Sequence, residues 1–214
     1  MTERNETKTL MIAGGGTGGH IYPAIAVARE FLSRGGDRRV VFIGTRYGLE
    51  KEIVPKAGFD LQFVSVRGLK GKSILHTAAN LARIPLAFVQ AWRLISRYDP
   101  QALLGVGGYA SGPVLVVGSL RRRPTIVQEQ NAFPGLTNRI LARFVDTLAV
   151  AFPKALEIFG REGVVTGNPV RSEFFELSRE SSTDGRARLL IFGGSQGSHI
   201  LNETTSRALH MLSD

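Results

Sequence analysis

The sequence predicts an α/β protein with a parallel sheet, because short apolar segments alternate with helical patterns along most of the chain. Glycine-rich turns join several of these segments, as is typical where a strand passes into a helix. Hydrophobic residues make up 43% of the 214 residues, which is enough for a substantial core. Such alternation indicates right-handed β–α–β units, in which neighbouring strands run parallel.

Each expected element follows from its local pattern. The predicted strands are short apolar runs that end at glycines or polar residues, namely 9–13, 40–44, 60–66, 102–106, 125–129 and 147–150. The predicted helices have longer periodic patterns, at 23–33, 50–57, 74–97, 113–120 and 136–143. We expect Pro85 to interrupt the third helix, because a proline ring clashes with the preceding helical turn.

The alternating pattern breaks after residue 167. Residues 177–187 are rich in Ser, Arg, Glu, Asp and Gly, a composition typical of a linker. A new strand is predicted at 188–192, followed by a glycine loop and a helix from about Ile200. One strand and one helix cannot bury their own faces. We therefore expect a first domain over 1–176 and the incomplete start of a second over 188–214.

Composition excludes several classes of protein. The chain has no cysteine, which excludes a disulfide scaffold, a cysteine-ligated metal and a thiol nucleophile. Residues 1–8 are polar and of mixed charge, unlike a signal peptide. The formal charge of +9 favours an anionic partner, although an ordinary basic surface would also explain it. No aromatic-basic stacking surface or recognition-helix motif is present, so we expect no nucleic acid.

Three glycine-rich loops lie between a predicted strand and a predicted helix, at 14–19, 105–112 and 193–197. Each places backbone N–H groups at a helix N-terminus, where the helix dipole favours an anion. Tight packing alone can also require glycine, so one such loop is weak evidence. Three loops at the carboxyl ends of parallel strands favour a phosphate-binding site.

The first loop also fits the pattern G-x-G-x-x-G of dinucleotide-binding oxidoreductases. Those enzymes need an acid at the end of the second strand to hold the ribose, and here that strand ends at Gly44, followed by Thr45 and Arg46. Arg46 leaves an NADP enzyme open as an alternative. A P-loop is absent, because no Gly-Lys-Ser/Thr follows any of the loops.

His20 directly follows the first loop. A single histidine is more often structural than catalytic. Here it lies where a bound phosphate and a reacting hydroxyl would meet, and imidazole changes protonation near neutral pH. It is therefore a candidate to accept a proton from that hydroxyl.

Six short motifs occur in a fixed order, at 15–20 with Pro23, 68–72, 107–113, 129–131, 167–171 and 193–197. These motifs and their order closely resemble those of the MurG family of bacterial N-acetylglucosaminyltransferases, and the resemblance runs from about Leu10 to the last residue. The resemblance implies a GT-B fold, with two Rossmann-like domains facing each other across a cleft. It also implies that the chemistry uses no metal and no other cofactor.

The resemblance further implies an inverting transfer of N-acetylglucosamine from UDP-N-acetylglucosamine (UDP-GlcNAc). The acceptor would be the C4 hydroxyl of the muramoyl sugar on lipid I, the undecaprenyl-diphosphate-linked precursor, and the product lipid II of peptidoglycan synthesis. We expect the isolated chain to bind the acceptor at best, since most donor contacts of the family lie beyond residue 214. The alternative is a non-catalytic acceptor-binding subunit that needs a separate donor-domain chain.

Residue roles are also implied by the matching motifs. His20 matches the position proposed in the family for the general base. The implied donor contacts are Thr17, Gly18, Gly19, Asn131, Arg171 and Ser195. The implied contacts to the acceptor diphosphate are Gly15, Gly16, Gly107, Gly108, Tyr109 and Ser111. Arg171 could instead form a salt bridge across the hinge, and Gln128 stands where many members carry histidine.

The segment 69–97 mixes apolar side chains, including Trp92, with lysines and arginines. A basic amphipathic helix of this kind suits an anionic membrane surface. We expect most of the apolar residues to pack on the sheet and a few to be exposed near the loop after Gly68. Together with the lipid-anchored acceptor, this predicts a peripheral protein on the cytoplasmic side of the cell membrane.

Overall fold

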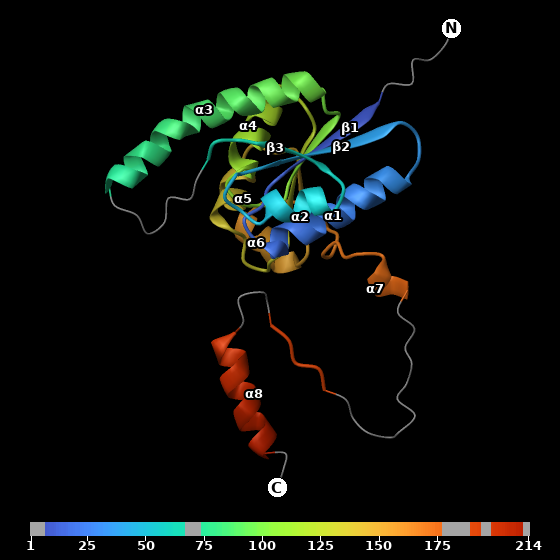
Figure 1. Ribbon diagram of the computed structural model, residues 1–214, viewed down its shortest axis with the longest axis vertical. Coiled ribbons are helices and arrows are strands. Elements are labelled where there is room, and N and C mark those ends of the chain that lie inside the picture. Colours follow the sequence, from blue (N-terminus) through green and yellow to red (C-terminus); the bar gives the residue numbers. More distant parts are fainter. Residues whose placement is uncertain (1–6, 67–73, 177–188, 194–197, 212–214) are drawn as a thin grey trace. The chain divides into compact units, whose positions relative to one another are not determined.

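A computed structural model describes residues 7–66, 74–176, 189–193 and 198–211. The chain divides into two compact units, Met1–Phe175 and Glu176–Asp214. The first unit has three layers, with one sheet between two layers of helices (Figure 1). In the second unit the described regular element is helix α8 (His199–Met211).

All pairings in the seven-stranded sheet are parallel, and its strand order is β3-β2-β1-β4-β5-β6-β7. The strands are β1 (Lys8–Ala13), β2 (Arg38–Gly44), β3 (Asp60–Phe63), β4 (Ala102–Gly105), β5 (Thr125–Glu129), β6 (Thr147–Val150) and β7 (Val164–Val165). The helices are α1 (Gly18–Ser33), α2 (Glu50–Lys56), α3 (Ile74–Tyr98), α4 (Ser111–Leu120), α5 (Leu136–Leu141), α6 (Pro153–Phe159) and α7 (Glu173–Glu176). The predicted α/β fold with a parallel sheet is confirmed.

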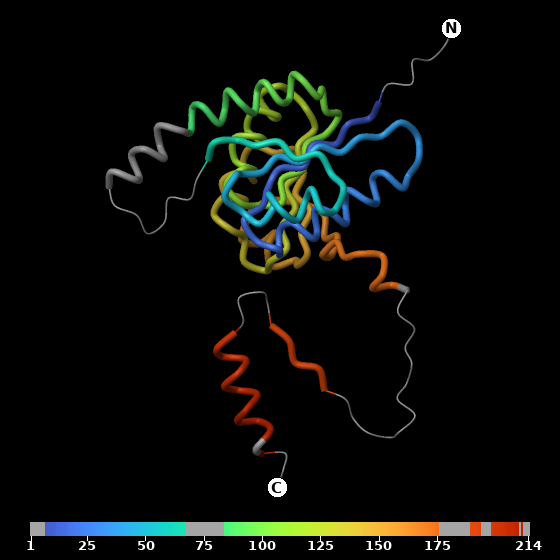
Figure 2. The backbone as a smooth tube through the Cα atoms, viewed as in Figure 1, coloured from blue at the N-terminus to red at the C-terminus, as the bar shows by residue number. Residues whose placement is uncertain are grey.

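Side chains of each strand alternate between the two faces of the sheet, and both faces are buried. In β1, Met11 and Ala13 join the core under α3, α4 and α5, whereas Leu10 and Ile12 join the core under α1 and α2. Figures 1 and 2 show the long helix α3 and helix α1 on opposite sides of the sheet. Burial on both faces explains why the central strands β1, β2 and β4 contain continuous apolar runs.

The strand order reverses direction between β1 and β4, which pair with Ala13 opposite Gly105. Open α/β sheets bind ligands at such a switch point, outside the carboxyl ends of the strands. The first glycine loop follows β1, and the second follows β4. The topology therefore brings two loops that are far apart in the sequence to the same edge of the sheet.

Two helices begin earlier than the sequence patterns indicated. Helix α1 begins at Gly18 rather than near Pro23, because Thr17 has the extended backbone of an N-cap and its carbonyl accepts the N–H groups of the next turn. Helix α4 begins at Ser111 rather than Pro113. The last glycines of both loops therefore lie in helical first turns.

The predicted interruption at Pro85 was wrong, since α3 continues from Ile74 to Tyr98 with Pro85 inside it. Ala87, Ala91 and Ile95 pack against the sheet and fix the course of the helix, while Pro85 faces solvent. Tertiary packing here outweighs local propensity. Within the described part of the chain, no helix combines the length and the apolar character needed to cross a membrane.

The strand predicted over 188–192 was also wrong, because Leu189–Phe192 has no regular secondary structure. A strand needs a neighbour to complete its backbone hydrogen bonds, and the described residues of the second unit include no other strand. The predicted linker at 177–187 lies outside the described residues. A short strand, β7, extends the sheet beyond the predicted pattern, and the short helix α6 precedes it.

Candidate functional site

The two glycine loops touch each other through their backbones. A Cβ atom on Gly108 would lie 2.6 Å from the carbonyl oxygen of Gly15, closer than such atoms can approach. Gly108 also has a φ of +81°, a region that other residues rarely adopt. Glycine at this position is therefore required for the contact that brings the loops together.

Ser111 fastens the second loop to the end of β1. Its hydroxyl donates to the carbonyl oxygen of Ala13 at 2.7 Å, and the carbonyl oxygen of Gly107 lies 2.9 Å away. The side chain is completely buried. Ser111, expected from the family motif to contact the acceptor diphosphate, is thus placed where its hydroxyl holds the loop in position.

A buried carboxylate lies directly beneath the first loop. Glu50 is only 2% exposed, and its oxygens accept hydrogen bonds from Gly16 N at 2.7 Å, Thr45 N at 2.8 Å and Thr45 Oγ1 at 2.9 Å. A Cβ atom on Gly15 would lie 2.3 Å from the carboxylate carbon. Gly15 therefore makes room for Glu50, as do Gly44 and Gly48, where a Cβ would lie 2.5 Å and 2.0 Å from the same side chain. Sequence reasoning missed this residue, because an acid in the first turn of a helix usually faces solvent.

Glu50 has two consequences for ligand binding. First, the N–H group of Gly16 is committed to Glu50 and is not available to a phosphate. Second, the Glu50 carboxylate does lie beside the end of β2, but it is buried and its oxygens are hydrogen-bonded to the protein. It cannot hold the ribose of a dinucleotide, and the guanidinium of Arg46 stacks on Phe63 at 4.8 Å. This arrangement weakens the NADP alternative.

His20 lies between the two loops with its two nitrogens in different surroundings. Nδ1 is 3.1 Å from the carbonyl oxygen of Gly15 and 3.2 Å from Thr17 Oγ1. A carbonyl oxygen can only accept a hydrogen bond, so the neutral ring carries its proton on Nδ1. Nε2 then has a free lone pair, and it lies 2.9 Å from where a Cβ on Gly107 would be. The ring is thus oriented to accept a proton at Nε2.

The first turn of α1 supplies donors for an anion. The N–H groups of Gly18 and Gly19 lie in this turn and have no acceptor among the described residues. The helix dipole makes this position favourable for negative charge. The predicted contacts Thr17, Gly18 and Gly19 therefore lie next to His20, as expected from their sequence positions.

The carboxyl end of β5 adds a third group of polar side chains. Glu129 is buried and accepts hydrogen bonds from the backbone of Asn131 and Gly135 and from the side chains of Asn131 and Asn138. Nδ2 of Asn138 would lie 3.6 Å from a Cβ on Gly107, which places this group beside the second loop. The Asn131 side chain is thus oriented by Glu129, and its Oδ1 remains for a ligand.

Three buried side-chain atoms in this group have no hydrogen-bond partner among the described residues. They are Nε2 of Gln128, Oε1 of Gln130 and Oδ1 of Asn138. Buried polar atoms are nearly always hydrogen-bonded. The protein already encloses these three atoms, so within the described structure they are unpaired without being open to a ligand.

Arg171 and Tyr109 lie at the surface of the first unit. The Arg171 guanidinium is 6.0 Å from the ring centre of Tyr22 and 5.3 Å from that of Phe174.

The Glu173 carboxyl, which is exposed, lies near two arginines. A hydrogen bond from the backbone N–H of Glu173 lowers the pKa of this carboxyl below its usual value, and the charges of Arg29 and Arg171 lower it further. Ser195 lies outside the described residues.

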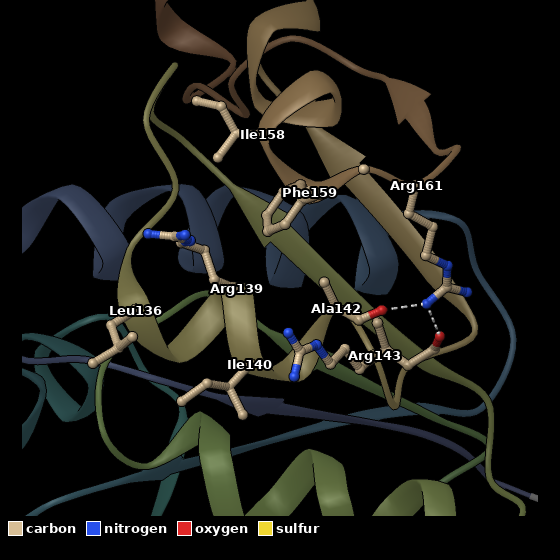
Figure 3. A pocket seen from close by; sticks show the side chains of 10 residues that line it. Leu136, Arg139, Ile140, Ala142, Arg143, Ile158, Phe159 and Arg161 are labelled. Carbon is tan, nitrogen blue, oxygen red and sulfur yellow. Dashed lines mark hydrogen bonds between the residues drawn. The ribbon is translucent and has the colours of Figure 1, made fainter.

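A separate cavity of about 580 Å³ lies at α5 and α6 and includes none of the predicted site residues (Figure 3). Figure 3 shows Arg139 and Arg143 beside it, while the Arg161 guanidinium is tied to the carbonyl oxygens of Ala142 and Val145. The chemistry-bearing residues gather instead at the switch point between β1 and β4.

Comparison with known proteins agrees with this geometry. The profile of the glycosyltransferase family 28 N-terminal domain matches residues 10–150. A relative from Anaeromyxobacter sp. (strain K) is 49% identical over 207 residues, which are 96% of this chain and 54% of the relative. It is named UDP-N-acetylglucosamine–N-acetylmuramyl-(pentapeptide) pyrophosphoryl-undecaprenol N-acetylglucosamine transferase. A relative of the same name from Myxococcus xanthus (strain DK1622) is 44% identical, with the same coverage.

The chain spans about half the length of these curated relatives. Among solved structures, the crystal structure of Acinetobacter baumannii MurG matches with a TM-score of 0.74 and 32% identity, over 94% of this chain and 57% of that chain. The family profile covers β1 to β6, which carry both described glycine loops and His20. The chain therefore belongs to glycosyltransferase family 28, whose N-terminal domain it contains.

Proposed function

We propose that this chain is the acceptor-binding half, with the start of the donor-binding half, of an enzyme that transfers N-acetylglucosamine from UDP-GlcNAc to lipid I. The acceptor group is the C4 hydroxyl of the muramoyl sugar, and the product is lipid II. The observation that carries the proposal is the meeting of two glycine loops at the switch point, with His20 between them. The names of the relatives supply the substrates.

The geometry suggests how each group acts. The loop backbone around Gly15, Gly107 and Gly108, with the hydroxyl of Tyr109, would hold the acceptor diphosphate. Nε2 of His20 would take the proton from the C4 hydroxyl as that oxygen attacks the anomeric carbon of the donor sugar. UDP leaves on the opposite side, which inverts the anomeric centre.

Charge on the donor diphosphate would be balanced by other groups. The free N–H groups of Gly18 and Gly19 lie at the positive end of α1. The Arg171 guanidinium offers a forked pair of donors that suits a phosphate. Asn131, which is held by Glu129, would complete the donor contacts of this half together with Thr17, and Ser195 would add a contact from the start of the donor-binding half.

The proposal is tested by mixing the purified chain with UDP-GlcNAc and a soluble lipid I analogue. We expect calorimetry to detect binding of the analogue, and radiolabelled donor to show no transfer. A longer polypeptide that includes the complete donor-binding half should catalyse the transfer. Failure of both polypeptides to bind the analogue would contradict the assignment of an acceptor site to this half.

We also propose that α3 contacts the cytoplasmic face of an anionic membrane. Leu86, Val89 and Trp92 are 47–51% exposed on this helix, and Arg93 and Arg97 are exposed beside them. Exposed apolar side chains among arginines suit a surface of anionic headgroups. Lys70 and Lys72, which also belong to the basic segment, lie outside the described residues.

Vesicle sedimentation checks this contact. Trp92→Glu should reduce binding to phosphatidylglycerol vesicles by about tenfold, because it removes an interfacial aromatic group and adds a repelled charge. Leu32→Glu is the matched control, since Leu32 is an exposed apolar residue on α1, which covers the other face of the sheet. Equal losses for the two variants would show that α3 has no special role.

A further inference from the structure

A second pocket adjoins the second glycine loop and differs in chemistry from the rest of the site. Its volume is about 250 Å³, and it lies between α3, α4 and α5. The walls are apolar and include Ile84 and Phe88 from α3, Val116 from α4 and Ile140 from α5. Tyr109, which directly follows Gly108 in the loop, forms part of the same wall. The pocket therefore reaches the place where the acceptor diphosphate is proposed to bind.

We propose that this pocket holds the first isoprene units of the polyprenyl chain of the acceptor. The inference rests on the proposed function, because it takes the diphosphate to lie at the second glycine loop. A prenyl chain bonded to that diphosphate must leave the loop along some path. An apolar pocket that begins at Tyr109 offers a path on which the hydrocarbon leaves water.

The other surroundings of the loops are unsuitable for hydrocarbon. Beneath the first loop the space is filled by the buried carboxylate of Glu50. Beside the second loop, Gln128, Gln130 and Asn138 bury polar atoms that lack partners among the described residues. Across the first turn of α1, hydrocarbon would cover the N–H groups of Gly18 and Gly19 that are unpaired within the described part of the chain, which is costly. The apolar pocket is the compatible route.

The pocket also suits part of a long chain rather than a whole ligand. It is smaller than the roughly 300–1,000 Å³ of sites that enclose a whole drug-sized ligand. Ile140 is half exposed and Leu141 is buried, so the wall runs from the surface to the core. The exposed residues Leu86 and Val89 lie on the same helix as Ile84 and Phe88, and they lead from the pocket to the proposed membrane contact.

Calorimetry with a series of soluble diphosphates tests the proposal on the 214-residue chain. The probes are inorganic pyrophosphate, geranyl diphosphate and farnesyl diphosphate. Affinity should rise by on the order of tenfold or more from pyrophosphate to farnesyl diphosphate, because several methylene groups then leave water. Ile140→Trp should remove this gain by filling the pocket, and it should leave the affinity for pyrophosphate unchanged.

Leu120→Trp is the matched control, because Leu120 is an exposed residue of α4 that does not line the pocket. It should keep the gain in affinity. Val116→Phe is a second filling variant, and it should also lose the gain. Circular dichroism melting curves establish that each variant is folded before its affinities are compared.

The remaining outcomes separate the two proposals. If pyrophosphate binds but affinity does not rise with chain length, the pocket assignment is overturned and the acceptor site stands. If no diphosphate binds, the acceptor site itself is refuted. If Ile140→Trp retains the gain but loses binding to phosphatidylglycerol vesicles, the pocket takes bilayer lipid and the prenyl assignment is wrong.

Discussion

Replacement of His20 by alanine, in a protein that includes both halves, should lower kcat by about 100- to 10,000-fold, the range typical of a lost general base. The Gly15 carbonyl fixes the proton on Nδ1 and leaves Nε2 as the acceptor. No other described side chain offers an equivalent free imidazole nitrogen beside both loops. The dissociation constant for UDP-GlcNAc should change little, because the donor contacts proposed for this half come from other residues.

Steady-state kinetics and equilibrium binding of UDP-GlcNAc measure the two effects separately. Lys154→Ala is the control, since Lys154 is an exposed residue of α6 outside the proposed site. It should leave kcat within about twofold of the unchanged protein, as surface substitutions usually do. A His20→Ala variant with normal kcat would show that this ring takes no part in proton transfer.

Replacement of Glu50 by alanine should lower the free energy of unfolding by about 2–4 kcal/mol, because it leaves buried donors without a partner. The unpaired groups would be Thr45 N and Oγ1, together with Gly16 N in the first loop. Loss of this anchor should also weaken pyrophosphate binding, since the loop is no longer held against Gly108. Chemical denaturation and calorimetry measure these two effects.

Glu52→Ala is the control for Glu50→Ala. Glu52 is an exposed acid in the first turn of the same helix, so its loss should change stability by no more than about 0.5 kcal/mol. Glu50→Gln preserves shape and one acceptor oxygen, and it should lie between the two. If Glu50→Ala were as stable as Glu52→Ala, the carboxylate would not support the loop.

Much of the fold could be predicted from the sequence because its signals are local. The runs at 40–44 and 102–106 are apolar throughout, as strands buried on both faces must be. The starts of helices α1 and α4, at Gly18 and Ser111, could not be predicted in this way, because they depend on the contacts of each loop. Glycine and proline near these positions suggested later starts, and packing decided otherwise.

The candidate site was accessible to sequence reasoning only in part. His20 and the glycines stand out because their positions in the chain match strand-to-helix turns. The roles of Glu50 and Ser111 depend on residues that lie 34 and 98 positions away in the chain. Only the strand order, which places β1 between β2 and β4, brings these partners together. No local pattern marks such residues.

The carboxylate under the first loop also bears on how this fold could be redesigned. In dinucleotide-binding proteins of similar architecture, an acidic residue at the end of the second strand hydrogen-bonds to the ribose of the adenosine. In this protein the corresponding volume is already occupied by the Glu50 side chain, which accepts three hydrogen bonds from the protein. Engineering a nicotinamide-cofactor site into this fold would therefore require removal of the Glu50 side chain. The first glycine loop, which orients His20, would then lose the hydrogen bond from Gly16 N that supports it.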